Sequence, residues 1–247
     1  MESAFDRTTL LVGKEAMERI SDARIIIFGI GGVGSWVAEA LVRTGLRHIT
    51  LVDSDRVAET NINRQMPATT ETIGEIKTVA AKRRLLEINP EADVRTLEIF
   101  YDADSAPQID LREYDYIVDA IDSLKDKALL ILNATRSGRK FFSSMGAALK
   151  MDPTKIRIGE FWSVKGCPLA RALRQRFKKN REYPARKFLC VYSDELLENK
   201  GTTDETCGYK ARINGSLCHI TAMFGMMLAG EIIKDLASDK TDTMHNS

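Results

Sequence analysis

The sequence predicts an α/β fold, a Rossmann-like, mostly parallel open sheet with helices on both faces and a C-terminal elaboration. Two observations predict it. Short apolar, β-branched runs alternate with stretches in which apolar residues recur at helical spacing, as expected when helices connect buried parallel strands. The first of these runs ends in a glycine-rich turn that leads into a helix, the usual form of a phosphate-binding unit.

This central unit consists of a strand, a glycine turn, a helix and a second strand. Residues 25–28 form the first apolar run, residues 29–34 the turn, and Gly45 ends the helix. A second run over 49–52 delivers Asp53 at its carboxyl end. Backbone N–H groups of such a turn can approach a phosphate, and the carboxylate can accept ribose hydroxyl groups. We therefore predict a nucleotide site whose glycines are Gly29, Gly31, Gly32 and Gly34.

The other elements of the N-terminal half follow from periodicity and from turn residues. They alternate between helices and strands, so the sheet should be mostly parallel, with ligands beyond its carboxyl edge. In order, we expect a helix over 8–20, polar loops over 53–74, a helix over 76–88, strands over 94–99 and 116–122, a helix over 125–137 and a strand over 140–144.

The pattern changes after residue 151, but no repeat or low-complexity linker separates the two halves. We expect a single domain over 1–237, with a nucleotide-binding core over 1–150, a C-terminal elaboration over 151–237 and a disordered tail over 238–247. The elaboration should contain a strand over 154–162, a strand over 188–193, a mobile polar loop over 195–214 and a final methionine-rich helix or helix pair over 216–236.

Composition excludes several classes of protein. The four cysteines are scattered without a CxxC pair, which argues against a zinc ribbon and against a disulfide framework. The most apolar C-terminal run, residues 220–233, is too short to cross a membrane and contains Glu231. No apolar leader follows Met1, so we expect a cytoplasmic protein without membrane attachment.

Positive charge is concentrated in one segment, residues 165–187. It contains nine Lys and Arg residues and one acid, a net charge of +8 against +1 for the whole chain, so the remainder carries −7. On charge alone such a cluster has two interpretations, a solvated helix face, which is the more usual one, and a surface for a phosphate backbone. The candidate RNA-contacting residues are Arg171, Arg174, Arg176, Lys178 and Lys179.

A second constellation goes beyond what nucleotide binding alone requires. A nucleoside triphosphate that donates its AMP moiety needs cations along its phosphates and a carboxylate for Mg²⁺. Arg64 and Lys77 can supply the cations and Asp122 the carboxylate, while Asn61 can hold the ribose or a phosphate oxygen. Asp55 has two equal interpretations, assistance to magnesium or a cap for the following loop.

These motifs, in this order, resemble the ubiquitin-activating-enzyme-like adenylating superfamily. The matching segments are GIGGVG, LVDSD, NINRQ, IKTVAA and VDAIDS, and the resemblance covers residues 7–147. It implies ATP with Mg²⁺, a homodimer, and adenylation of a carboxylate with loss of pyrophosphate.

The resemblance also implies a role for individual residues. Asp53 should bind the ribose, Arg64 and Lys77 the phosphates, and Asp122 the magnesium. Arg7 matches an N-terminal arginine that reaches into the partner subunit's ATP site. With Arg7 added, the implied catalytic set is Arg7, Arg64, Lys77 and Asp122.

Within that superfamily, the chain resembles the bacterial tRNA threonylcarbamoyladenosine dehydratases over nearly its whole length. The segments that carry this resemblance are FDRTTLLVGKEAMERI, VGSWVAEALVRTG, VDAIDSLKDKALLI, GAALKMDPTKI and CPLARALRQRFKK. The resemblance implies a tRNA substrate bearing threonylcarbamoyladenosine, whose threonine carboxylate is adenylated and then displaced by ring closure with loss of AMP. It leaves open whether a sulfur-relay protein also docks.

Three other functions compete with this one. A sulfur-carrier adenylyltransferase would keep the chemistry, but those enzymes usually hold zinc on two CxxC pairs, which are absent here, and we expect no zinc. An NAD-dependent oxidoreductase would leave Arg64, Lys77 and Asp122 without a role. A non-catalytic adaptor would be expected to have lost one of these three residues.

The remaining polar residues have weaker assignments. Cys207 lies in the predicted mobile loop and is a candidate reactive thiol, with a structural role as the alternative. Cys190 and Cys218 lie in apolar stretches and should be core, and packing is the expected role of Cys167. Asp119 should be structural.

Overall fold

The computed structural model describes residues 4–201 and 214–238. Its sheet has seven strands in the order β3-β2-β1-β4-β5-β7-β6, and all neighbours are parallel except β6 and β7. This arrangement confirms the predicted fold class. The strands are β1 (Arg24–Phe28), β2 (His48–Val52), β3 (Asp93–Leu97), β4 (Tyr116–Asp119), β5 (Lys140–Ser144), β6 (Ile156–Glu160) and β7 (Leu189–Ser193).

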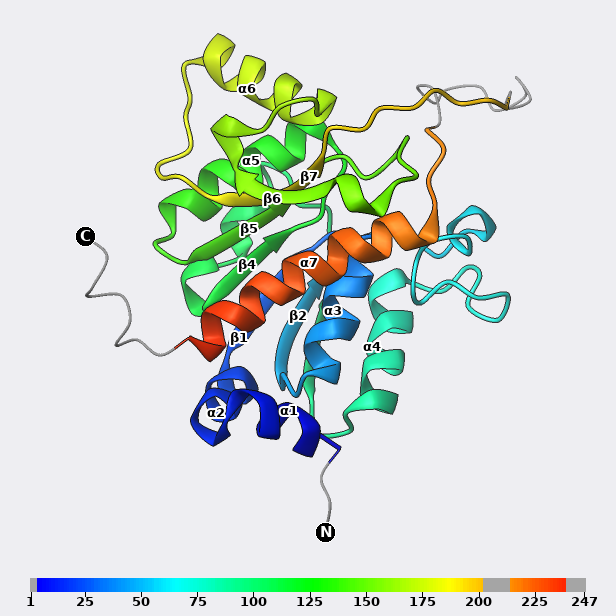
Figure 1. The fold of residues 1–247 in the computed structure, drawn as a ribbon, viewed down its shortest axis with the longest axis vertical. Helices are drawn as coiled ribbons and strands as arrows, with labels where there is room; N and C mark the ends of the chain where they lie inside the picture. Colours follow the sequence, from blue (N-terminus) through cyan, green and yellow to red (C-terminus); the bar gives the residue numbers. More distant parts are fainter. Residues whose placement is uncertain (1–3, 202–213, 239–247) are drawn as a thin grey trace.

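Helices cover both faces of the sheet. Figure 1 shows α3, α4 and α7 crossing in front of the strands, while α5 and α6 pack together on the other side. The α-helices are α1 (Asp6–Val12), α2 (Lys14–Asp22), α3 (Gly34–Arg43), α4 (Lys77–Ile88), α5 (Leu124–Arg136), α6 (Pro168–Asn180) and α7 (Cys218–Ala237). Short 3-10 turns lie between them at Glu59–Asn61, Ala106–Gln108, Leu111–Glu113, Pro153–Lys155 and Phe161–Ser163.

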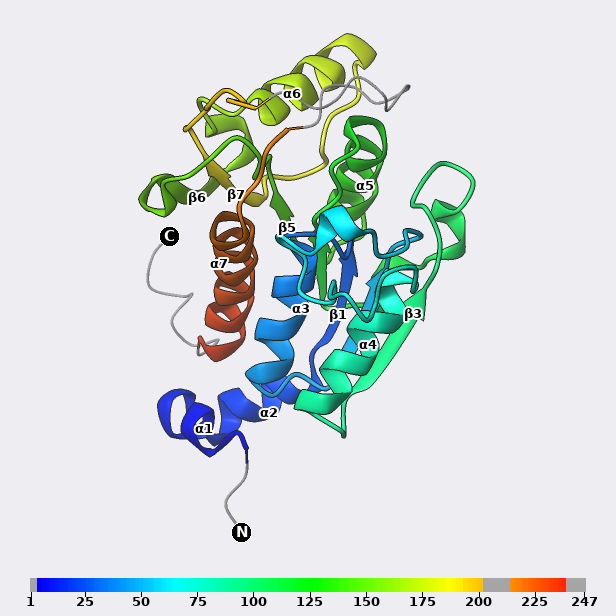
Figure 2. The ribbon, with the colours of Figure 1, turned by 90° about the vertical axis from the view of Figure 1, so that its right-hand side faces the viewer.

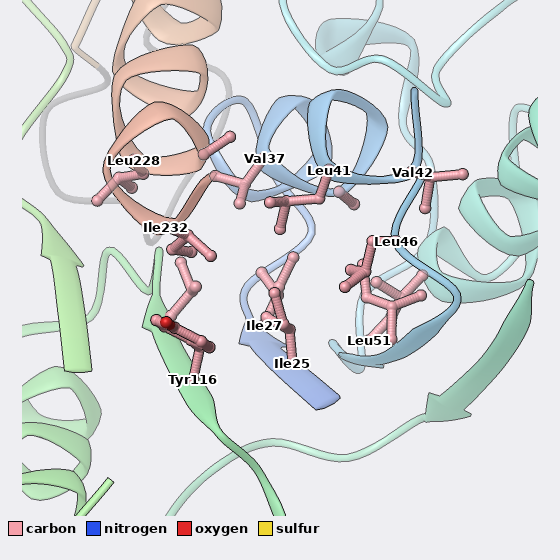
Figure 3. Close-up of a cluster of buried hydrophobic side chains, with 14 of the residues drawn as sticks. Ile25, Ile27, Val37, Leu41, Val42, Leu46, Leu51, Tyr116, Leu228 and Ile232 are labelled. Carbon is pink, nitrogen blue, oxygen red and sulfur yellow. The ribbon is translucent and has the colours of Figure 1, made fainter. Parts of the chain in front are cut away.

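The sheet separates two apolar clusters. Alternate side chains of β1 point to opposite faces, so Ile25 and Ile27 belong to one cluster and Ile26 and Phe28 to the other. Figure 3 shows the first cluster, in which side chains of α3 and α7 meet those of β1. Burial on both faces explains why these strands are continuous apolar runs rather than alternating ones.

Three predicted elements differ in the structure. The helix expected over 8–20 is two helices, because Gly13 has a φ of 85° and interrupts the helical backbone between α1 and α2. The strand expected over 116–122 ends at Asp119, and the strand expected over 154–162 is restricted to β6 by a 3-10 turn at each end.

The final segment is one helix, α7, which packs along α3 and extends toward α2 (Figure 2). At its C-terminal end, Arg19 of α2 donates hydrogen bonds to the carbonyls of Leu236 and Ala237. Among the described residues, none of the helices is long and apolar enough to cross a membrane. The predicted mobile loop lies partly, and the predicted tail almost entirely, outside the described residues.

Candidate functional site

A cavity of about 820 Å³ opens at the carboxyl end of the sheet, between the glycine turn after β1 and the segment after β4. The order of the strands reverses direction between β1 and β4, next to this cavity. Open α/β sheets bind ligands at such a reversal. Predicted residues far apart in the sequence meet in its lining. They are Gly29, Gly31, Gly32, Asp53, Asp55, Asn61, Arg64, Lys77 and Asp122.

The glycine turn is shaped by close approach between backbones. Gly29 has φ of 87°, and a Cβ on it would lie 2.7 Å from the carbonyl oxygen of Ala120. A Cβ on Gly34 would lie 1.9 Å from the carbonyl oxygen of Gly29. Gly34 is not part of the cavity lining, so its role is to close the turn rather than to face a ligand.

Asp53 organises the turn from the end of β2. Its Oδ2 accepts a hydrogen bond from the N–H of Ile30 at 2.7 Å, and its Oδ1 accepts one from the N–H of Asp55 at 2.8 Å. Burial raises the pKa of Asp53, and attraction to Lys77 opposes that rise. The carboxylate is therefore fixed in the cavity wall, where remaining lone pairs can accept from hydroxyl groups.

Lys77, the first residue of α4, forms an ion pair with Asp55. Its Nζ lies 2.7 Å from Asp55 Oδ2, the lysine side chain is 7% exposed and that of Asp55 is 55% exposed. The N–H of Lys77 also donates to the carbonyl of Asp55 at 3.0 Å. This carboxylate holds the ammonium group at the cavity, and both interpretations of Asp55, assistance to magnesium and a cap for the following loop, stay predictions.

The 60–65 loop contributes four polar residues to the cavity lining, which are Thr60, Asn61, Arg64 and Gln65. Arg64 donates to the carbonyl of Thr60 at 2.8 Å and to the Oδ1 of Asn63 at 2.9 Å, so its guanidinium is held by its own loop. Asn61 Oδ1 accepts from the N–H of Ala58, so this oxygen is used within the loop, and the predicted contact of Asn61 with the ribose or a phosphate oxygen stays a prediction. The buried Oε1 of Gln65 lacks a hydrogen-bond partner among the described residues.

Asp122 lies exposed in the segment that follows β4. No cluster of three or more His, Cys, Asp or Glu side chains able to hold a metal occurs within residues 4–201 and 214–238. Magnesium in proteins is often held by one or two carboxylates together with substrate phosphates. A single carboxylate beside a glycine turn of this kind therefore fits magnesium that a bound nucleotide would bring in.

A buried ion pair lies beneath this segment, and the sequence indicates only one of its members. Asp119, the last residue of β4, is fully buried, and its Oδ2 lies 2.8 Å from the Nζ of Lys127 and 2.7 Å from the hydroxyl of Ser143. Lys127 also donates to the carbonyl of Ile121 at 2.8 Å. The structural role predicted for Asp119 is confirmed. Sequence reasoning missed Lys127, although its place on the apolar face of α5 is a signal.

The cavity extends past the nucleotide-binding motifs toward the C-terminal elaboration. This part is lined by residues 144–150 and by the start of α6. Lys150 is buried there, its Nζ donates to the carbonyl of Glu195 at 2.5 Å, and burial lowers its pKa. Sequence reasoning also missed Lys150, because a lone lysine between two turn segments gives no sequence signal.

Arg7 is not brought into this cavity. It is an exposed residue of α1, and α1 and α2 lie near the amino ends of the strands, away from the carboxyl edge (Figure 1). The same helix leaves Leu10 and Leu11 85% and 86% exposed and buries none of its residues.

The basic segment forms α6 and the chain that follows it. Arg171, Lys178 and Lys179 are exposed, whereas Arg174 donates to the carbonyl of Phe161 at 3.0 Å and lies over its ring. Arg174 thus anchors α6 instead of projecting freely. Arg176 is half-buried.

The cysteines divide into two groups. Cys167 and Cys190 are buried, as predicted, and burial raises the pKa of Cys190 to about 12. Cys218 is exposed, so the prediction that it belongs to the core is wrong. It is the first residue of α7, and the buried residues of this helix begin at Ile220. Cys207 lies outside the described residues.

Comparisons with known proteins give relatives over the whole chain. The sequence profile of the ThiF family matches residues 5–247. The tRNA threonylcarbamoyladenosine dehydratase of Haemophilus influenzae is 36% identical over 250 residues, 97% of this chain and 95% of that protein. The enzyme of the same name from Bacillus subtilis is 33% identical over 243 residues, 95% of each chain.

The fold comparison agrees with the sequence comparison. The crystal structure of Escherichia coli tRNA N6-threonylcarbamoyladenosine dehydratase in complex with ATP superposes with a TM-score of 0.85 and 33% identity, covering 99% of this chain and 96% of that one. A sulfur carrier protein adenylyltransferase from Thermus thermophilus is 37% identical, but over 119 residues, or 48% of this chain.

Proposed function

The chain belongs to the ThiF family, and from this membership we propose that it is an ATP-dependent tRNA threonylcarbamoyladenosine dehydratase. The observation that carries the proposal is the single cavity that joins the glycine turn, Asp53, Lys77 and Asp122. Relatives with this activity match the chain from end to end, including the C-terminal elaboration. The sulfur-carrier adenylyltransferase matches only about half of it.

The reaction needs two steps at a carboxylate that is otherwise a poor electrophile. An oxygen of the threonine carboxylate attacks the α-phosphorus of ATP, and pyrophosphate leaves, which gives an acyl adenylate. A nucleophile within the threonylcarbamoyl group then attacks the activated carbonyl, closes a ring and expels AMP. The carboxylate oxygen departs with AMP and the attacking nucleophile releases its proton to solvent, so the nucleoside has formally lost one water.

The residues of the cavity supply positioning and charge for these steps. The turn around Gly31 and Gly32 offers backbone N–H groups to phosphates, and Asp53 accepts from the ribose. Lys77 and Arg64 lie where they can balance the negative charge that develops on the phosphates during transfer. Ring closure is intramolecular, so orientation of the bound nucleoside contributes much of its rate.

Asp122 is the residue that would hold magnesium, together with phosphate oxygens of the nucleotide. The ion would screen the charge of the triphosphate. Lys127 acts one layer below, because its bonds to Asp119 and to the Ile121 carbonyl fix the segment that carries Asp122.

A homodimer with Arg7 acting in the partner's cavity is part of this proposal. In its own subunit Arg7 lies away from the carboxyl edge of the sheet, and the adjacent Leu10 and Leu11 are almost fully exposed. An apolar helix face beside a cation that has no role in its own cavity supports contact with a second copy. Substrates of this kind, ATP and tRNA, also support a cytoplasmic location.

The basic residues of α6 would contact the tRNA backbone. Because α6 begins at the cavity rim with Pro168 and continues outward, Arg171, Lys178 and Lys179 could follow a strand that leaves the site. A reactive role for Cys207 stays a prediction, as does docking of a sulfur-relay protein.

The test is nucleoside mass spectrometry of tRNA that contains threonylcarbamoyladenosine, incubated with the protein and Mg-ATP. We expect a product lighter by one water, with AMP and pyrophosphate in equal amounts. Asp122→Asn should remove the product, whereas Asp104→Asn, the same change at an exposed residue outside the cavity, should leave it unchanged.

Other outcomes would redirect the proposal. An unchanged nucleoside, with pyrophosphate released only after a diglycine-tailed carrier protein is added, would indicate the sulfur-carrier reaction. Hydride transfer to a nicotinamide cofactor would indicate an oxidoreductase, and neither activity an adaptor.

A further inference from the structure

A second, smaller cavity of about 360 Å³ lies at the opposite end of the sheet from the nucleotide cavity. It is enclosed by the starts of β5 and β7 and by the end of α7. We call it the lower cleft. Its lining residues are Arg139, Lys140, Phe141, Phe142, Arg186, Lys187, Phe188, Leu189, Glu231, Lys234, Asp235 and Ser238. Strand β5 connects the two cavities, with Ser144 in one and Lys140 in the other, roughly 13 Å apart along an extended strand.

The lower cleft has an excess of positive charge that its own acids do not neutralise. Five of its residues are cationic and two are acidic. Asp235 is bound to Lys140 at 3.0 Å, and Glu231 lies 3.9 Å from Lys234. This leaves Arg139, Arg186 and Lys187 without an ion-pair partner among residues 4–201 and 214–238.

A further acid near the lower cleft, Asp110, is also occupied. Asp110 is close enough to feel Arg139, but its pKa is lowered to about 2 chiefly by hydrogen bonds from Arg112. The carbonyls at the end of α7, which would repel an anion, accept hydrogen bonds from Arg19. The free charge in the lower cleft is therefore positive.

The local structure holds these cations together. The N–H of Ala185 donates to the buried hydroxyl of Thr135 at 3.1 Å, which ties the chain before Arg186 to the end of α5. Gly138, with φ of 82°, then turns α5 into the start of β5 and places Arg139 on the same side. Beneath the cations lie the buried rings of Phe141 and Phe188, 5.0 Å apart.

Arg186 and Lys187 are also the last two cations of the basic segment that begins near the nucleotide cavity. In Figure 1 this segment passes from α6 down the left edge of the molecule to β7, ending near the C-terminal end of α7. The lower cleft is thus the far end of one basic path rather than an isolated patch.

From this juxtaposition we propose that the lower cleft binds the phosphodiester backbone of an RNA chain, at a point remote from the reacting nucleoside. A guanidinium group can donate two parallel hydrogen bonds to the oxygens of one phosphate. A path of cations along one side of a protein suits a polyanion better than a single small anion. That the RNA is a tRNA rests on the proposed function. The positive charge of the lower cleft, its geometry and the basic path that leads to it are independent of that function.

The experiment measures binding of an unmodified tRNA transcript to the full-length protein across a series of salt concentrations, so no turnover is needed. The test variant is R139Q/R186Q/K187Q. The matched control, K82Q/R83Q/R95Q, removes three charges from α4 and β3, at the opposite side of the sheet. R186Q/K187Q, which changes two exposed side chains only, serves if the triple variant folds poorly.

We expect the test variant to bind tRNA at least tenfold more weakly near 0.1 M salt. Because each phosphate contact adds about 0.7 to 0.9 to the salt slope of log K, the slope should fall by about 2. ATP affinity and the rate at saturating tRNA should not change, because the lower cleft is remote from the nucleotide. The control should stay within twofold of wild type.

Three results would overturn the proposal. Equal tRNA binding by the test variant and wild type would show that the lower cleft does not contact tRNA. An equal loss of binding in the control variant would show that only the overall charge of the protein matters. Binding of inorganic phosphate or polyglutamate that depends on these cations, with tRNA binding unaffected by them, would assign the lower cleft to another anion. If wild type neither binds tRNA nor dehydrates its nucleoside, the proposed function fails as well. If wild type dehydrates the nucleoside and the test variant binds tRNA normally, the proposed role of the lower cleft is wrong but the proposed function stands.

Discussion

The Nζ of Lys127 lies 2.8 Å from the Oδ2 of Asp119, and neither side chain is exposed to solvent. Each charge would be costly to bury alone, and the pair is completed by Ser143 and by the backbone around Ile121. It lies directly under the segment that carries Asp122, so loss of the pair should also displace this proposed magnesium ligand.

Removal of one partner should therefore be severe. Lys127→Met should lower the free energy of unfolding by about 3 to 5 kcal/mol, because it leaves a buried carboxylate unpaired. Urea denaturation measures the change. Lys125→Met, at an exposed position on the same helix, should stay within about 0.5 kcal/mol. The double variant D119N/K127M should recover part of the loss, and a double variant worse than the sum of the single changes would contradict the ion-pair account.

Lys77 and Asp55 should differ in importance although they are partners. Lys77→Met should reduce kcat for pyrophosphate release by about 100-fold to 1000-fold, the usual cost of removing a group that stabilises developing charge. Asp55→Asn should cost less, since it only loosens the ammonium group. Pyrophosphate release under saturating ATP checks both. A larger loss in Asp55→Asn would indicate a direct role for that carboxylate, such as binding magnesium.

Asp53 predicts a pH dependence of stability. Burial raises its pKa in the folded state above the ordinary value of 3.8. Between these two pKa values the folded state holds more protons than the unfolded state, so this group makes the free energy of unfolding fall as pH rises. Relative to Asp53→Asn, wild type should lose stability as pH increases from 3.8 upward through the raised pKa. Urea titrations of both proteins at several pH values give the difference, and a difference that is constant or grows in favour of wild type would exclude the effect of burial.

The described thiols should differ in reactivity. Cys190 is buried and its pKa is raised to about 12, so at pH 8 it should not react with an alkylating reagent in the native state. Cys218 is exposed and should be modified within minutes. Peptide mass spectrometry after labelling distinguishes them, with Cys218→Ser as the control. Labelling of Cys190 at a rate like that of Cys218 would show that β7 opens readily.

The proposed exchange of Arg7 between subunits can be tested by mixing. R7A and K77M should each be inactive and folded. Subunits mixed before refolding should regain about a quarter of the wild-type activity, because half of the dimers are mixed and each of those has one intact site. Unchanged inactivity of the mixture, with dimers present by light scattering, would place Arg7 in its own subunit's site, and full activity of R7A alone would remove its role.

Much of the site could be predicted because its signals are local. The glycine turn is visible in the sequence as four glycines within positions 29–34. The apolar run that precedes Asp53 and the one that precedes Asp122 each mark the end of a buried strand. A parallel sheet brings those ends to one edge, so the pattern of residues is enough to place Asp53 and Asp122 in one cavity.

Other features depended on contacts between residues far apart in sequence. Asp55 is engaged by Lys77, and Arg174 lies on Phe161. Gly13 divides a segment whose periodicity is continuous, and the lower cleft gathers cations from the ends of α5 and α7 and from the starts of β5 and β7.

By itself the sequence determined the fold class, the nucleotide-binding turn and the residues available for chemistry, because periodicity and turn residues act within a few positions. Only the tertiary structure decided which charges are used internally and which are left for a ligand. Pairing of a charge depends on what packing places within about 4 Å of it, and a partner at that distance can come from anywhere in the chain.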